Sequence, residues 1–82
     1  MTARETIIAK RVLDYLHDLD GGQEHELSVH AGIGGLNLCP SEEFRQVLKI
    51  LDTERYVVGV TTRFKGVMWS ISDLGESARL KM

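Results

Sequence analysis

The chain has 82 residues, a formal net charge of −2 and 43% hydrophobic residues, an ordinary composition for one small globular domain. No apolar run exceeds three residues, which excludes a transmembrane helix of about 20 apolar residues. With Cys39 as its only cysteine and no pattern of a secretory signal, we expect a cytoplasmic protein.

The charge is divided unevenly between the two halves of the chain. Residues 1–40 carry three basic and six acidic side chains, whereas residues 41–82 carry seven basic and six acidic ones. DNA-binding domains are usually strongly basic, because phosphate neutralisation supplies most of their affinity. Any nucleic-acid role therefore has to rest on a local surface in the second half.

The first predicted element is an amphipathic helix over residues 2–19. Thr2 and Glu5 have the spacing of a capping box, in which each side chain bonds the backbone N–H of the other. Apolar side chains recur three and four residues apart and so share one helix face. The members of this face are Ile8, Val12, Tyr15, Leu16 and Leu19. Gly21 and Gly22 end the helix, because glycine adopts the left-handed cap without a steric penalty.

Residues 23–39 allow two interpretations. Either residues 26–29 form a short strand, or residues 24–31 form a two-turn helix. The glycines at 32, 34 and 35 are typical of a loop. No Gly-Lys-Ser/Thr sequence follows them, so this loop is not a phosphate-binding P-loop.

The second long predicted helix spans residues 41–54. Ser41 has the residue type of an N-cap, and Glu42 and Glu43 place negative charge at the positive end of the helix dipole. Four apolar residues at helical spacing form its buried stripe. They are Phe44, Val47, Leu48 and Leu51.

Two β-favouring segments, 56–62 and 67–71, follow and predict an antiparallel hairpin joined by a short turn with glycine. Apolar and more polar residues alternate in the second segment, so we expect one of its faces to pack. Large side chains assigned to the core are Tyr15, Leu16, Val60 and Trp69. Ser72 then caps a last short helix over residues 74–80.

This order of elements resembles the winged helix-turn-helix family, and three segments carry the resemblance. Residues 41–51 are similar to the family's recognition helix, with a capping residue, polar positions and two leucines three apart. Tyr56-Val57 resembles the apolar pair that opens the wing strand. Residues 71–76, Ile-Ser-Asp-Leu-Gly-Glu, resemble the aliphatic, Ser/Thr, x, x, Gly, acid sequence with which many members leave the wing.

The resemblance extends over residues 2–82 and implies an α+β fold. It implies a single winged-helix domain over residues 1–82, with a three-helix core, a two-stranded antiparallel wing and a short C-terminal helix. Two positions depart from the family pattern. Glu54-Arg55 stand where the family often has glycine, and Glu42 and Glu43 begin the helix whose N-terminal end usually enters the major groove.

The resemblance further implies a small prokaryotic or phage-type transcription regulator that binds double-stranded DNA. The recognition helix 41–54 would lie in the major groove and the wing 57–71 on the DNA backbone. Arginine reads guanine, glutamine reads adenine and lysine neutralises phosphate, so the residue types suit such contacts. The expected DNA-binding residues are Ser41, Arg45, Gln46, Lys49, Arg63 and Lys65. A solvated helix face and an ordinary exposed turn are the alternative interpretation of the same residues.

A protein-interaction module without DNA binding is the alternative function. The acidic pI near 5.9, the carboxylates of Glu42 and Glu43 and the aromatic Phe64 at the turn all suit a protein partner. As a DNA-binding protein, the chain is expected to form a homodimer through its first and last helices.

The sequence offers no pattern for catalysis or for a cofactor. Its three histidines and Cys39 lack the spacing of a structural zinc site, which needs four well-placed ligands. A chain of 82 residues also leaves little room for a catalytic cleft. We therefore expect no metal, no cofactor and no enzyme activity, and no association with a membrane.

Overall fold

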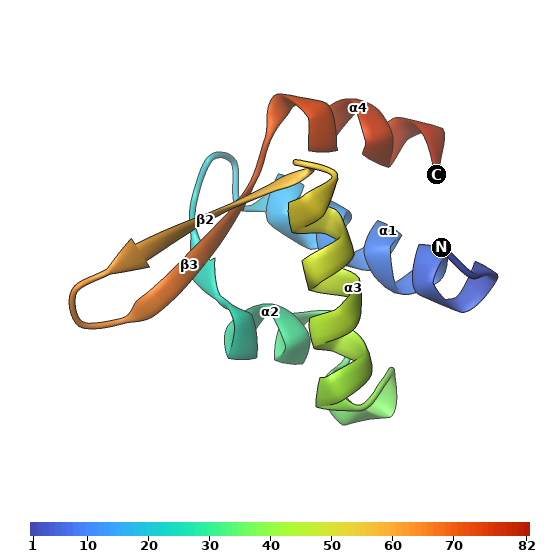
Figure 1. Cartoon of the computed structure of the whole chain (residues 1–82), viewed down its shortest axis with the longest axis horizontal. Coiled ribbons are helices and arrows are strands. Elements are labelled where there is room, and N and C mark those ends of the chain that lie inside the picture. The colour runs from blue at the N-terminus through green and yellow to red at the C-terminus, as the bar shows by residue number, and fades with distance from the viewer.

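The computed structural model describes all residues, 1–82, and contains four α-helices, a single 3-10 turn and one three-stranded antiparallel sheet (Figure 1). In chain order the elements are α1 (Ala3–Asp18), β1 (Glu24–His25), α2 (Glu26–Gly32), η1 (Gly35–Asn37), α3 (Ser41–Thr53), β2 (Val57–Thr62), β3 (Gly66–Ile71) and α4 (Asp73–Lys81). The expected α+β class is confirmed. None of the helices combines the length and the apolar character needed to cross a membrane.

Helix α1 forms as its local sequence predicts. The Thr2 hydroxyl accepts a hydrogen bond from the Glu5 N–H at 3.1 Å, and the Glu5 carboxylate accepts one from the Thr2 N–H at 2.8 Å. The capping box is therefore complete. Left-handed backbone at Asp20 and Gly21, with φ of 50° and 86°, follows the end of the helix. The residues that α1 buries are Ile8, Ala9, Val12, Leu13 and Leu16.

The ambiguous segment contains both a strand and a helix, each displaced from its predicted position. The strand β1 is only two residues long, and pairs Glu24 with Trp69 and His25 with Met68. Residues 26–29, predicted as a strand in one interpretation, belong to α2 instead. The His25 Nδ1 accepts the Leu27 N–H at 3.2 Å and so caps this helix. Because β1 joins the sheet, the hairpin has a third strand that the expected two-stranded arrangement lacks.

Helix α3 buries the four predicted apolar residues, but its N-cap is Pro40. The Pro40 carbonyl accepts the first i to i−4 bond, from the Phe44 N–H at 3.0 Å, while its own backbone stays extended. Ser41 is already the first helical residue and makes no capping hydrogen bond. The prediction of Ser41 as the N-cap is therefore wrong by one residue.

The C-terminal end of α3 turns without a glycine. Arg55 adopts a left-handed φ of 64°. Its N–H donates to the Asp52 carbonyl at 3.0 Å, and the Tyr56 N–H donates to the Leu51 carbonyl at 2.9 Å. These two bonds define a Schellman-type helix end, which glycine usually supplies. The helix end therefore forms although Glu54-Arg55 stand where the winged-helix pattern often has glycine.

Strands β2 and β3 pair from Val57 opposite Ile71 to Thr62 opposite Gly66, and their hairpin projects away from the helices (Figure 1). At its base, Trp69 and Ile71 pack against the core. Val60, predicted in the core, is 41% exposed. It lies directly opposite Met68, and neighbouring positions of a strand face opposite sides of the sheet. Val60 therefore points away from the face that carries Trp69.

Helix α4 begins at the predicted cap and packs on α1. The Ser72 hydroxyl accepts the Gly75 N–H at 3.0 Å. The Nδ1 of His17 lies 2.8 Å and 2.9 Å from the two carboxylate oxygens of Glu76, and Arg79 donates to Asp14 at 3.1 Å. The last helix is thus held to the first by two polar contacts.

Candidate nucleic-acid interface

The polar face of α3 lies opposite its buried stripe and is open to solvent. Arg45, Gln46 and Lys49 are all exposed. No ion pair and no side-chain hydrogen bond involves any of the three. Their charged and polar groups are therefore available for contacts with another molecule.

A groove of about 450 Å³ runs along one side of this polar face. Gln46 and Lys49 line it from α3, and Glu5 lines it from α1. Its other lining residues are Ile50, Thr53 and Glu54. Arg45 does not contribute to the groove, so the polar face of α3 has one side toward α1 and one side away from it.

The two acidic residues at the start of α3 differ in their surroundings. Glu43 accepts two hydrogen bonds from the guanidinium of Arg4, at 2.7 Å and 2.8 Å. This bidentate pair holds the pKa of the Glu43 carboxyl below its ordinary value. Glu42 is exposed and has no partner. Of these two residues, only Glu42 therefore presents an uncompensated carboxylate. The exposed Asp52, three residues after Lys49, is a further carboxylate of α3 without an ion pair.

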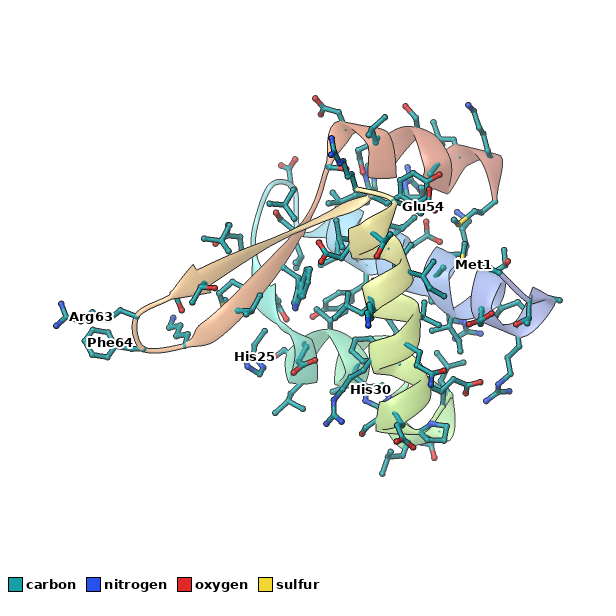
Figure 2. The ribbon with its side chains drawn as sticks, in the orientation of Figure 1. Met1, His25, His30, Glu54, Arg63 and Phe64 are labelled. Carbon is teal, nitrogen blue, oxygen red and sulfur yellow. The ribbon has the colours of Figure 1, made fainter.

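The tip of the hairpin carries the other two predicted cations. Arg63 and Lys65 are exposed and flank Phe64, and the carbon of the Arg63 guanidinium lies 5.5 Å from the centre of the Phe64 ring (Figure 2). The Thr62 hydroxyl accepts the Lys65 N–H at 3.1 Å and donates to the Gly66 carbonyl at 2.8 Å. These bonds close the turn that presents the three residues.

The six predicted site residues fall into two separate groups. Ser41, Arg45, Gln46 and Lys49 lie on α3, whereas Arg63 and Lys65 lie at the far end of the projecting hairpin (Figures 1 and 2). No hydrogen bond or ion pair joins the two groups. A single small ligand would not reach both, but an extended anionic molecule offers charges to each.

The contact between Arg4 and Glu43 was not predicted from the sequence. The two residues are 39 positions apart, and neither belongs to a recognisable motif. One N–H of the Arg4 guanidinium also donates to the Leu38 carbonyl at 3.3 Å. Arg4 therefore holds the loop before α3 and its first turn against α1, and no local pattern predicts this.

The histidines and the cysteine serve the structure. His30 is 6% exposed, stacks on the Phe44 ring at 4.6 Å, and donates from Nε2 to the Cys39 carbonyl at 2.9 Å. Cys39 is buried, as expected, and burial raises the pKa of its thiol. A thiol held in its protonated form is a poor nucleophile. Across residues 1–82, no three His, Cys, Asp or Glu side chains gather in an arrangement that suits a metal ion.

Comparisons with models of protein families, with curated proteins and with solved structures found no match to this chain. Its function is therefore argued from the surfaces described above.

Proposed function

We propose that the chain is a winged-helix domain that binds double-stranded DNA, with α3 in the major groove and the β2–β3 hairpin as the wing on the backbone. One observation carries this proposal. Two elements, one helix face and the projecting hairpin, each present exposed cations that form no ion pair: Arg45 and Lys49 on α3, and Arg63 and Lys65 on the hairpin. Three helices around one core, followed by a hairpin, support the winged-helix assignment.

The chemistry of α3 suits a groove that is about 12 Å wide and admits a helix. Arg45 carries the paired donors that recognise the O6 and N7 atoms of guanine, and Gln46 matches the N6 and N7 atoms of adenine. Lys49 supplies a point charge for a phosphate. The Ser41 hydroxyl makes no capping bond, so it remains free to donate to a phosphate at the start of the helix.

The arrangement of acidic groups favours the same surface. Arg4 neutralises Glu43, which leaves Glu42 as the one unpaired carboxylate in the first turn of α3. On the hairpin, the turn from Arg63 to Lys65 contains two cations and no acid. The hairpin turn therefore offers only positive charge to phosphates, whereas α3 offers Arg45 and Lys49 with the exposed carboxylates of Glu42 and Asp52 on the same helix.

We further propose that the protein binds DNA as a homodimer through α1 and α4. Ile7 on α1 and Leu74 and Leu80 on α4 are exposed apolar side chains, which a second copy would cover. Few phosphate contacts per domain make a single copy a weak binder, and pairing doubles their number. Two half-sites about 34–36 Å apart would match such a dimer.

Protein interaction without DNA binding remains the second candidate function, because one surface favours it specifically. Phe64 is 90% exposed, and Val58 and Val60 are exposed on the outer face of the hairpin. Exposed apolar groups of this kind are typical of sites that bind another protein. A protein partner would be bound by the hairpin and would not need the cations of α3.

The test is fluorescence anisotropy with a labelled random-sequence duplex, from low to physiological salt. We expect binding that weakens steeply with salt, and a salt slope that falls by about one for each phosphate contact removed. The test variants are Lys49→Ala and the pair Arg63→Ala/Lys65→Ala. Arg11→Ala is the matched control, because Arg11 is an exposed, unpaired cation on α1 outside both groups.

Two results would contradict DNA binding. One is an anisotropy that does not change at low salt with wild-type protein. The other is an equal loss of affinity in Arg11→Ala and Lys49→Ala, which would mean that only net charge matters. Retained affinity in Arg11→Ala with a smaller slope in Lys49→Ala would support the proposal.

A further inference from the structure

The tip of the hairpin carries an aromatic ring that is in contact with Arg63 and lies outside the hydrophobic core. Phe64 is 90% exposed, whereas the other phenylalanine, Phe44, is 2% exposed. Figure 2 shows Phe64 and Arg63 at the end of the hairpin, beyond every other element. A ring in this position contributes nothing to the hydrophobic core. The ring is therefore accessible to a flat ligand.

The ring is presented by a turn with a defined structure. The hairpin pairing continues up to Thr62 opposite Gly66. Gly66 has a φ of 70°, and the Thr62 hydroxyl bonds both the Lys65 N–H and the Gly66 carbonyl. A turn closed by these bonds loses little conformational freedom when its side chains engage a ligand.

The two faces of the Phe64 ring are not equivalent. The Arg63 guanidinium covers one face at 5.5 Å from the ring centre, within the range of a cation–π contact. The opposite face is free. Lys65 adds a second cation immediately after the ring. The ligand that fits has a flat aromatic group for the free face and negative charges on both sides of it.

We propose that Phe64 stacks on an unpaired DNA base while Arg63 and Lys65 hold the phosphates on either side of it. This inference rests on the proposed DNA binding and specifies which DNA the protein prefers. In a paired duplex each base is covered above and below, so a ring gains access only by unstacking a base step. An unpaired base at the end of a duplex offers its face without that cost, and every base has such a face.

A preference for DNA with an unpaired base follows, and α3 and the hairpin have separate parts in it. The cations of α3 bind the duplex portion, whereas Phe64 binds the unpaired base next to it. Loss of the ring therefore removes the preference but not the binding to duplex. Loss of an α3 cation weakens the binding of both kinds of DNA but leaves the preference for the unpaired base unchanged.

The experiment compares two labelled DNA molecules by anisotropy at one salt concentration. One is a fully paired duplex, and the other is the same duplex with a 3′ extension of four thymines. Stacking of one base predicts that wild-type protein binds the extended DNA about 5-fold to 100-fold more tightly. Phe64→Leu, which keeps the apolar volume but removes the ring, should bring the ratio close to one. Lys49→Ala is the matched control and should keep the wild-type ratio.

A second readout reports the stack directly. A fluorescent adenine analogue, 2-aminopurine, placed as the first unpaired base loses emission when an aromatic ring stacks on it. We expect quenching with wild-type protein and with Lys49→Ala, and none with Phe64→Leu. Because Phe64 is exposed, the Leu variant should unfold at the wild-type temperature, which excludes misfolding as the cause.

The outcomes separate this inference from the proposed function. If wild-type protein binds the two DNA molecules equally and Lys49→Ala binds both more weakly, the stacking proposal is overturned and the proposal of DNA binding stands. Binding of neither DNA would overturn both and would direct attention to a protein partner for the hairpin. A preference that persists in Phe64→Leu would also overturn the role of the ring.

Discussion

Gly75 of α4 lies directly against the backbone carbonyl of Tyr56, where the chain leaves α3. A Cβ atom at position 75 would collide with the Tyr56 carbonyl oxygen and lie 2.8 Å from Cγ1 of Ile71. The same carbonyl accepts the Ser72 N–H at 3.1 Å, and the Ser72 hydroxyl donates to the Arg55 carbonyl at 2.6 Å. The Ser-x-x-Gly spacing of residues 72–75 thus docks α4 onto the connection between α3 and β2. This motif therefore has a structural explanation of its own.

We predict that Gly75→Ala destabilises the domain by about 1–3 kcal/mol, because a fixed carbonyl cannot move away from the added methyl group. Helix propensity alone predicts the opposite sign, since alanine is favoured over glycine by about 1 kcal/mol in a helix interior. Urea denaturation measures the change. Ser77→Ala, at an exposed position of the same helix, is the control. A Gly75→Ala variant as stable as wild type would rule out the close approach.

His30 is predicted to be needed for its hydrogen bond as well as for its volume. His30→Phe keeps a flat ring to stack on Phe44 but removes the Nε2 donor, so the Cys39 carbonyl loses its partner. An unsatisfied buried acceptor costs about 1–3 kcal/mol. The urea midpoint at pH 7 should therefore fall although the variant is more hydrophobic. An unchanged midpoint would mean that stacking alone explains the burial of His30.

The elements that could be predicted are those specified by neighbouring residues. The capping box of Thr2 and Glu5 and the cap at Ser72 join residues three apart, so their bonds follow from local sequence. The buried stripe of α3 follows from helical periodicity in the same way. In each case the partners are fixed before the chain folds.

The features that could not be predicted depend on distant partners. β1 is two residues long and exists only because it pairs with Trp69 and Met68, far along the chain. Arg4 meets Glu43 across 39 positions. Val60 lies on the outer face because the hairpin register sets its direction, and alternation alone leaves two choices. The division of the candidate interface between a helix and a hairpin was predicted from the sequence, whereas the pairing of Glu43 with Arg4 beside it required the fold.

The Arg4–Glu43 pair predicts a pH dependence of stability. The hydrogen bonds from Arg4 lower the pKa of Glu43 in the folded state below its ordinary value of 4.5. The stabilisation is therefore complete above pH 4.5 and is lost as the pH falls through the folded pKa, because the unfolded chain takes up the proton first. When the pH is lowered from 7 to 3, the urea midpoint of the wild type should fall further than that of Glu43→Gln. A parallel fall in the two proteins would contradict a role for the pair.

The final prediction concerns Glu42, the acidic residue in the first turn of α3 that has no partner. Glu42, Arg45 and Lys49 are three and four residues apart, so they share one face of the helix. If this face binds DNA, the Glu42 carboxylate repels the phosphates that Arg45 and Lys49 attract. Repulsion between unit charges at 4 Å is about 1 kcal/mol in water and is screened by salt. Glu42→Gln should therefore raise the affinity for duplex DNA about threefold to fivefold at low salt, and less at physiological salt.

The control for this variant is Asp18→Asn, which removes one exposed carboxylate from α1 and changes the net charge equally. The thermal midpoint of Glu42→Gln must be measured as well, because a carboxylate in the first turn also stabilises the helix dipole by about 0.3–1 kcal/mol. A gain confined to Glu42→Gln, together with a lower midpoint, would show that this residue opposes DNA binding while it stabilises α3. An equal gain of affinity in Asp18→Asn would mean that the effect comes from net charge alone. An unchanged affinity in Glu42→Gln would mean that α3 does not face the phosphates, and the hairpin alone would remain as the binding surface.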